Sequence, residues 1–315
     1  MCRLFFSFRN KYVKPLLKEF LEQSHHAHKN TPDIDNYRDF DTHENGFGIA
    51  WLPYENETWN IYKQPMSYKD DPNVDSVLDM IPNNLILGHI RRKTIGEEVY
   101  ENTHPFSYRD QVFMQNGSIS DFSKHKKIVY SYISSPLVKE IIGDTDTECL
   151  FYLFLSCVKY IEKRHQYSHY ISKKNSTRKK TTKQSEFTRK QIALYETVIE
   201  NTGFIHKNDV SSVYINAFRM LVTIFRLHEM EVGCNIMYAN DEFVIITRYL
   251  QYDKSKYDNP QLSQSMYWNK CRKNGDTGLL ITSEPMTGYE HVLIPESTII
   301  VVNYKKYDMV IHSIL

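Results

Sequence analysis

The sequence predicts an α+β protein in which core strands are combined with long amphipathic helices. Two kinds of pattern predict this class. Apolar runs of strand length occur at residues 2–8, 85–90 and 298–303, and apolar residues at helical spacing occur at residues 12–23 and 149–163. The chain has 315 residues, long enough to bury on the order of 75% of its unfolded surface. Both kinds of element can therefore share a large core.

Composition and charge exclude several classes of protein. A chain that is 41% hydrophobic and 13% aromatic is not disordered throughout. Lys and Arg number 39 against 38 Asp and Glu, so the net charge of +1 gives no global field that would attract nucleic acid or an anionic membrane. The N-terminal apolar run is too short for a signal peptide, and we expect no membrane-spanning stretch.

The five cysteines are far apart and lack CxxC spacing, which favours reduced thiols over a disulfide framework or a zinc site. We expect a soluble cytoplasmic protein with no metal and no cofactor.

The first strand begins with a cysteine. In residues 2–8 the side chains of Cys2, Leu4, Phe6 and Phe8 share one face, because side chains alternate across a strand. If Met1 is removed, the α-amine of Cys2 lies beside its thiol and can take up and return the thiol proton, so that one residue supplies nucleophile and base. The alternative is an inert buried thiol, which is the commoner role of a cysteine.

Two polar stretches follow buried strands. Residues 91–94 are Arg-Arg-Lys-Thr directly after the strand at 85–90, and the stretch is either a solvated strand end or a place where an arginine grips a carboxylate. Asn116-Gly117 follows a strand beginning at residue 111. This pair is ordinarily a tight turn, but its side-chain amide and backbone N–H groups could also form an oxyanion hole.

Acidic residues precede the strongest helix pattern. Thr145 and Glu148 fit a capping box before the helix at 149–163, and acids suit the positive end of a helix. Asp146 belongs to the same first turn and could also meet a substrate ammonium group.

Five short motifs occur in a fixed order: MCR at residues 1–3, GHIRRKT at 88–94, NTHPF at 102–106, QNGSISDF at 115–122 and GDTDTECLF at 143–151. Together they resemble the class II glutamine amidotransferases, which are N-terminal-nucleophile hydrolases. The likeness is strongest to the stand-alone branch that includes the amidotransferase-like subunit of the fungal glutathione-degrading complex. ITSEP at 281–285 is similar to the same branch. The resemblance implies a four-layer αββα sandwich.

The resemblance also implies a role for particular residues. Cys2 matches the nucleophile, Arg91 the arginine that grips the glutamine α-carboxylate, and Asp146 the acid that holds the α-ammonium. Asn116 and Gly117 match the oxyanion hole, and Thr94 and His104 fall in the substrate-binding loop motifs. This sequence departs from the usual pattern at Gln115, where many members have His, and at Asn45, where this branch often has Asp.

The rest of the chain is expected to continue one amidotransferase domain spanning residues 2–315. Residues 163–190 hold ten Lys and Arg against one Glu, which predicts a basic surface insertion. Beyond it we expect a helix at 209–231, a hairpin at 235–249 and further strands at 278–282 and 292–294.

Three functions are compatible with these observations. The first is hydrolysis of a γ-glutamyl amide, in glutamine or in a γ-glutamyl peptide such as glutathione, through a Cys2 thioester; for this function the resemblance implies a separate metallopeptidase-like subunit. The second is a glutaminase subunit that delivers ammonia to a separate synthase. The third is a non-catalytic scaffold that binds nucleic acid or an acidic partner through the basic insertion.

Overall fold

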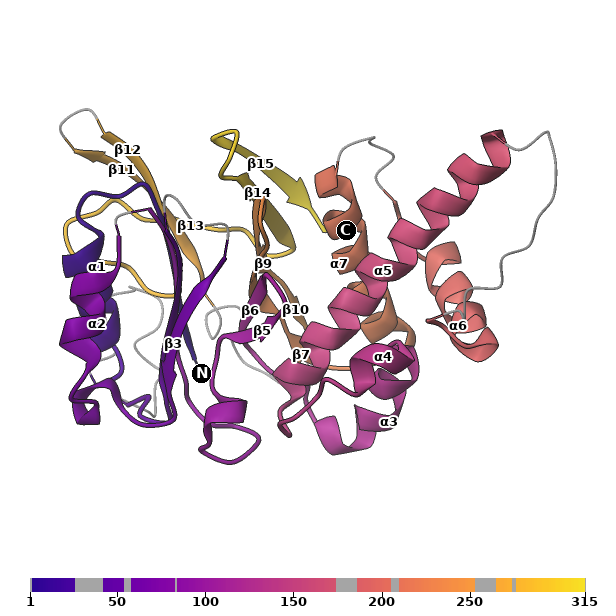
Figure 1. Cartoon of the computed structure of the whole chain (residues 1–315), viewed down its shortest axis with the longest axis horizontal. Coiled ribbons are helices and arrows are strands. Elements are labelled where there is room, and N and C mark those ends of the chain that lie inside the picture. The colour runs from indigo at the N-terminus through magenta and orange to yellow at the C-terminus, as the bar shows by residue number, and fades with distance from the viewer. Residues whose placement is uncertain are drawn as a thin grey trace. The chain divides into compact units, whose positions relative to one another are not determined.

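The computed structural model describes residues 2–25, 42–53, 58–82, 84–173, 186–204, 210–252, 265–273 and 276–314, without the side chains of residues 165–173 and 270–277. The chain divides into two compact units (Figure 1). Unit 1 comprises Met1–Ser118 and Val232–Ser313, and unit 2 comprises Ile119–Glu231 and Ile314–Leu315.

Unit 1 contains a seven-stranded sheet with β1 near its centre. The sheet has the order β13-β11-β12-β1-β4-β2-β3, and each neighbouring pair is antiparallel. Its strands, in chain order, are β1 (Arg3–Phe8), β2 (Phe47–Leu52), β3 (Asn60–Gln64), β4 (Leu85–Ile90), β11 (Tyr267–Lys273), β12 (Asp276–Thr282) and β13 (Val292–Leu293).

A second sheet in unit 1 has six strands in the order β15-β14-β9-β8-β6-β5. Its strands, in chain order, are β5 (Phe106–Tyr108), β6 (Gln111–Asn116), β8 (Asn235–Ala239), β9 (Phe243–Arg248), β14 (Thr298–Asn303) and β15 (Asp308–Ser313). A short ribbon joins β7 (Val232–Gly233) to β10 (Leu250–Gln251).

The two sheets pack face to face through a core of alternating side chains. Leu4, Phe6 and Phe8 of β1 lie in this core with Met114 of β6 and Ile246 of β9. The even positions of β1 thus share one buried face, as the sequence predicts, because successive side chains of a strand point to opposite faces.

The opposite face of the seven-stranded sheet is covered by two helices, α1 (Val13–Glu22) and α2 (Val74–Met80), with the short 3₁₀ turns η1 (Tyr68–Asp70) and η2 (Tyr100–Asn102) elsewhere in the unit. Phe5 of β1 faces these helices, and its ring centroid lies 5.1 Å from that of Phe20. The helix expected at 12–23 is thus α1, whose apolar stripe is buried on the sheet.

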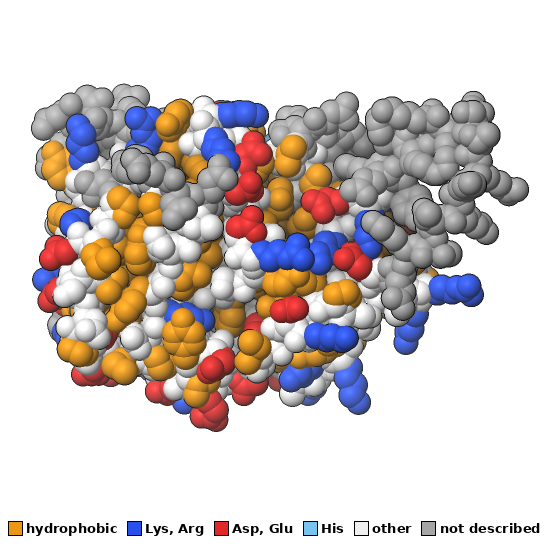
Figure 2. Space-filling model, in the orientation of Figure 1, with side chains coloured by type: hydrophobic (Ala, Val, Ile, Leu, Met, Phe, Trp, Pro, Cys, Tyr) orange, Lys and Arg blue, Asp and Glu red, His pale blue; other side chains and the backbone are white. Residues whose placement is uncertain are grey.

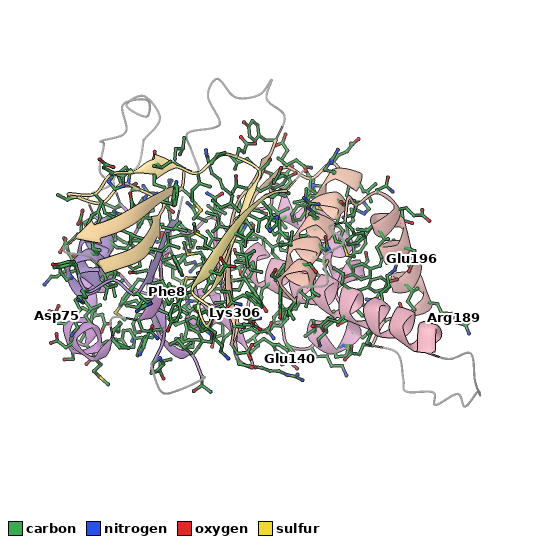
Figure 3. All side chains as sticks on the ribbon, turned by 90° about the horizontal axis from the view of Figure 1, so that it is seen from above. Phe8, Asp75, Glu140, Arg189, Glu196 and Lys306 are labelled. Atoms are coloured by element: carbon green, nitrogen blue, oxygen red, sulfur yellow. The ribbon has the colours of Figure 1, made fainter. Side chains whose placement is uncertain are left out.

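Unit 2 consists of helices: α3 (Phe122–Tyr132), α4 (Ser135–Val138), α5 (Asp146–Lys173), α6 (Arg189–Glu200) and α7 (Val210–Leu227). Glu196 of α6, labelled in Figure 3, accepts a hydrogen bond from the Tyr160 hydroxyl of α5 at 2.6 Å. The ring of Tyr160 also stacks on that of Tyr195, with centroids 4.5 Å apart. These contacts fix α6 against α5.

The predicted capping box at the start of α5 forms in part. Thr145 Oγ1 accepts the N–H of Glu148 at 3.2 Å. The Glu148 carboxylate accepts the N–H groups of Ile142 and Gly143, at 3.0 and 2.8 Å, and so stabilises the turn that leads into the helix.

Helix α7 has the length and composition of a membrane span, with a mean hydropathy of 1.2 over 18 residues. From the sequence we expect no membrane-spanning segment. However, 67% of this stretch is buried inside the protein, where α7 packs against α5 and α6. A buried core helix is apolar for the same physical reason as a membrane helix, since neither meets water on most of its surface.

The fold class predicted from the sequence is confirmed: the protein is α+β with antiparallel sheets, and the helices and the two sheets are the elements of an αββα sandwich. The single-domain assignment stays a prediction. Residues 174–185 of the basic insertion lie outside the described residues, whereas residues 163–173 form the last turns of α5, and Lys163 Nζ lies 2.8 Å from the Glu186 carboxylate. On the face seen in Figure 2, described side chains of both signs are interspersed.

Candidate active site

Cys2 lies at the start of β1, beside the end of β4. The antiparallel register pairs Arg3 with Ile90, so the next residues along the two strands are Cys2 and Arg91. The Cys2 side chain is 9% exposed. Its Sγ accepts the N–H of Arg92 at 3.4 Å and lies 3.5 Å from the carbonyl oxygen of the same residue.

Arg91 is buried and closes the loop that follows β4. Its guanidinium donates to the carbonyl of Glu97 at 3.0 Å and to those of Ile95 and Gly96 at 3.0 and 3.5 Å. Its backbone N–H also donates to Gly46 at 2.7 Å. The loop is therefore folded around the charged group that is predicted to grip a carboxylate.

Asn116 is the last residue of β6 and pairs with Asn235 of β8. The Asn-Gly pair is therefore a strand end and not the tight turn that such a pair ordinarily makes. The Asn116 side chain is buried, and its Nδ2 donates to Ser283 Oγ at 3.4 Å. The same Ser283 Oγ accepts the N–H of Leu4 at 2.9 Å. One hydroxyl thus connects the predicted oxyanion donor to the strand that carries Cys2.

Gly117 follows Asn116 with φ +152°, and its backbone lies against Gly233. A Cβ at position 117 would lie 1.9 Å from the carbonyl oxygen of Gly233. The adjacent Ser118 accepts the N–H of Gly233 at 2.9 Å. Only glycine fits here, and the close approach fixes the peptide that would supply the second oxyanion donor.

Gln115 occupies the position where many family members have His, and its side chain supports the same loop. Gln115 Nε2 donates to the Gly233 carbonyl at 2.7 Å. Gln115 thus helps to hold the backbone of Gly117 against Gly233.

Two buried histidines stack beside these residues. The ring centroids of His89, on β4, and His104, before β5, are 3.8 Å apart. His89 Nε2 lies 3.1 Å from the carbonyl oxygen of Gln115, which can only accept, so this nitrogen carries a proton. Burial lowers the pKa of His89 to about 3 and lowers that of His104 well below its usual value, and the nearby Arg91 charge adds to both shifts. Both rings are neutral at neutral pH.

The remaining predicted residues are Thr94 and Asp146. Thr94 is exposed in the loop after β4. Asp146 belongs to unit 2, where it is the first residue of α5 and is buried. Its two carboxylate oxygens accept the N–H groups of Ile119 and Thr147, at 2.7 and 2.9 Å. Ile119 follows Gly117 by two positions in the chain.

The structure thus brings Cys2, Arg91, Asn116 and Gly117 to one end of the strands of unit 1. A thiol can attack a carbonyl carbon, amide N–H groups can stabilise the oxyanion that forms, and a guanidinium can bind a carboxylate. No group of three or more metal-ligating side chains occurs among the residues that the structure describes.

Reasoning from sequence missed His89 and Ser283, although both lie in quoted motifs, GHIRRKT and ITSEP. Each acts by a contact across the sheet or between sheets, which residue spacing does not show. The signal that could have found them is a polar residue inside or directly after an otherwise apolar strand, because such a residue needs a partner.

Residues 35–185 match the family model described as "Glutamine amidotransferases class-II". The match begins after Cys2 and therefore does not include the predicted nucleophile. The chain is 32% identical over 114 residues to Probable glutamine amidotransferase DUG3 of Saccharomyces cerevisiae, which is 35% of this chain and 32% of that protein.

The chain is also 30% identical over 127 residues, 39% of its length, to the protein MJ1515 of Methanocaldococcus jannaschii, of which 32% is covered. Each match therefore spans about a third of the curated relative. Among solved structures, a glutamine aminotransferase class-II domain protein from Silicibacter pomeroyi aligns over 99% of both chains, with a TM-score of 0.54 and 15% identity. That likeness confirms the fold. Together these comparisons confirm the resemblance predicted from the motifs and identify this chain as similar to the class-II glutamine amidotransferases.

Proposed function

We propose that this protein hydrolyses a γ-glutamyl amide bond, in glutamine or in a γ-glutamyl peptide such as glutathione, with Cys2 as nucleophile. The observation that carries the proposal is the shared contact of Ser283, whose hydroxyl bonds both the strand of Cys2 and the amide of Asn116. This contact supports the proposal because acyl transfer requires a nucleophile and a nearby hydrogen-bond donor that can stabilise the oxyanion.

Binding would use the two charges of the glutamyl head group. The Arg91 guanidinium suits a carboxylate because its N–H groups form a rigid fork, and Asp146 suits the α-ammonium. Holding the head group fixes the γ-carbonyl beside Cys2, and such orientation supplies much of the rate gain of an enzyme. His104 and Thr94 remain predicted members of the substrate loop.

The reaction proceeds in two steps, acylation of Cys2 and hydrolysis of the resulting thioester. The α-amine of Cys2, exposed by removal of Met1, takes the thiol proton, and the sulfur attacks the γ-carbonyl carbon. The oxyanion accepts hydrogen bonds from Asn116 Nδ2 and the Gly117 N–H. The C–N bond then breaks, the amine returns the proton to the leaving nitrogen, and a γ-glutamyl thioester remains on Cys2. Water hydrolyses the thioester to glutamate and regenerates the thiol.

We further propose that the protein acts in the cytoplasm with a separate subunit, either metallopeptidase-like or a synthase. Support for the location comes from the buried cysteines Cys2, Cys149 and Cys157, which carry no disulfide. Support for a partner comes from the resemblance alone.

The test is turnover of glutamine and of glutathione by the purified protein, after intact mass has shown whether Met1 is absent. We expect glutamate release, and hydroxylamine should intercept the thioester as γ-glutamyl hydroxamate. Cys2→Ala should abolish both products. Cys149→Ala is the matched control, because burial raises the pKa of that thiol to about 11 and it should stay unreactive.

The leaving group separates the alternatives. Release of cysteinylglycine from glutathione supports peptide hydrolysis, and release of ammonia from glutamine alone supports a glutaminase that serves a synthase. A chain that retains Met1, or one that makes neither product and no hydroxamate, would contradict the proposed function.

A further inference from the structure

Just after β12, a side-chain hydroxyl takes the place of a backbone carbonyl in the hydrogen bonding to β1. Thr282 is paired with Phe5 of β1, and the N–H of Ser283 donates to the Leu4 carbonyl at 2.9 Å. The return bond from the Leu4 N–H goes to the Ser283 hydroxyl and not to its carbonyl. The Ser283 carbonyl instead accepts the hydroxyl of Ser265 at 3.1 Å. The hydroxyl of Ser283 is thereby fixed on the edge of β1.

The same hydroxyl accepts a hydrogen bond from Asn116 Nδ2 at 3.4 Å. An amide nitrogen carries two hydrogens in one plane, so binding one of them determines the direction of the other. Both side chains are almost fully buried, with Ser283 3% and Asn116 2% exposed, and water does not compete strongly for this contact. The contact with Ser283 therefore restricts the direction of the second N–H of Asn116.

The next residue holds the backbone of Cys2. Glu284, 1% exposed, forms an ion pair with Arg3. The Nη1 of Arg3 in turn donates to the carbonyl of Cys2 at 3.3 Å. Adjacent residues of one segment thus contact the strand of the nucleophile and the oxyanion donor.

We propose that Ser283 is a positioning residue for the reaction: its hydroxyl aligns the Asn116 amide with the sulfur of Cys2, while Glu284 holds the Cys2 backbone through Arg3. Ser283 contacts no reacting atom. The inference rests on the proposed function, because it assigns Ser283 to the step in which the oxyanion forms.

The test is a double-mutant cycle measured on wild-type protein and variants with a substrate that the wild type turns over. Asn116→Ala should lower kcat on the order of 100 to 1,000-fold. Ser283→Ala should lower kcat about 10 to 100-fold with KM little changed, because a misdirected donor still leaves substrate binding intact. In the double variant the loss should equal that of Asn116→Ala alone, because Ser283 acts only through that amide.

Ser265→Ala is the matched control. It removes a buried hydroxyl that contacts the same residue, but Ser265 bonds the Ser283 carbonyl and not its hydroxyl, so kcat should change less than about 3-fold. The rate at which iodoacetamide alkylates Cys2 should also be unchanged in Ser283→Ala, because alkylation forms no oxyanion. Ser283→Cys introduces a side chain of similar shape whose sulfur is only a weak hydrogen-bond acceptor, so it should show the same kcat loss. This variant is used for the test if Ser283→Ala does not fold.

The outcomes separate this inference from the function on which it rests. A wild-type protein without γ-glutamyl turnover would overturn both. If the wild type turns over the substrate but the kcat losses of the two single variants multiply in the double variant, the role of Ser283 is overturned while the proposed function stands. A loss in Ser265→Ala as large as that in Ser283→Ala, or slower alkylation of Cys2, would show that the serine only supports the local fold.

Discussion

At the scale of single residues, the site depends on how closely two backbones approach. Gly117 has a positive φ, and its Cα hydrogen occupies the space where a Cβ would meet the carbonyl of Gly233. The peptide that is predicted to supply the second oxyanion donor can approach Gly233 this closely only because residue 117 has no side chain. This explains why a glycine follows Asn116.

Gly117→Ala should be destabilising by about 2 kcal/mol or more, and the protein that still folds should lose most of its activity. The reason is that the added methyl group must push the peptide away from Gly233. Chemical denaturation and a turnover assay measure the two effects. Gly203→Ala is the matched control, because no atom lies within 4 Å of its added Cβ, and a similar loss there would contradict the argument.

At the scale of elements, the stacked pair of His89 and His104 joins β4 to the segment before β5. His89 also bonds the carbonyl of Gln115, next to the oxyanion loop, and so connects the two sheets of unit 1. The pair is buried and neutral, which makes it a source of acid sensitivity.

The free energy of unfolding should fall as the pH falls from about 6.5 toward about 3. In that range the unfolded chain binds a proton at each histidine, while the folded protein, whose His89 pKa is lowered to about 3, does not. Each histidine should contribute about 1 kcal/mol of this loss between pH 7.5 and 5.5.

His104→Phe keeps an aromatic ring in the stack and removes one titrating group. Its loss of stability between pH 7.5 and 5.5, measured by urea unfolding, should be smaller than that of the wild type by about 1 kcal/mol. An identical pH dependence in the two proteins would show that the pair is not the origin of the effect.

Helix α7 makes a separate prediction at this scale, as the core helix of unit 2. Phe225 is fully buried, so Phe225→Ala should cost about 3 to 5 kcal/mol of unfolding free energy in water. Leu227→Ala in the same helix is the control, because Leu227 is 41% exposed and should cost under about 1 kcal/mol. Equal effects in denaturation would show that α7 does not form a core.

At the scale of the whole molecule, the elements that sequence predicts best are those with a complete apolar face. The strands β4 and β14 have the bounds predicted from their apolar runs, and α1 differs from its prediction by one residue at each end. Burial of one continuous face leaves a periodic pattern in the residues themselves.

Two strands that the sequence reading missed, β3 and β15, lack such a face. All residues of β3 are half-buried, and β15 is largely exposed at the edge of its sheet. Their stability comes from hydrogen bonds to a neighbouring strand, which leave little trace in local sequence. Ser283 was missed for a related reason, since it bonds a residue 279 positions away and spacing along the chain carries no record of that contact.

The loop closed by Arg91 has a consequence for motion. Since the guanidinium holds the carbonyls of Ile95, Gly96 and Glu97, Arg91→Lys would keep the charge but lose the fork that makes these bonds. We expect the amides of residues 92–98 to exchange with deuterium at least about tenfold faster in that variant, because local opening costs less, while the amides of β4 keep their protection. Mass spectrometry of the exchanged peptides would reveal this, and unchanged exchange in the loop would mean that other contacts hold it. The same arginine would then both bind the substrate and keep this loop ordered.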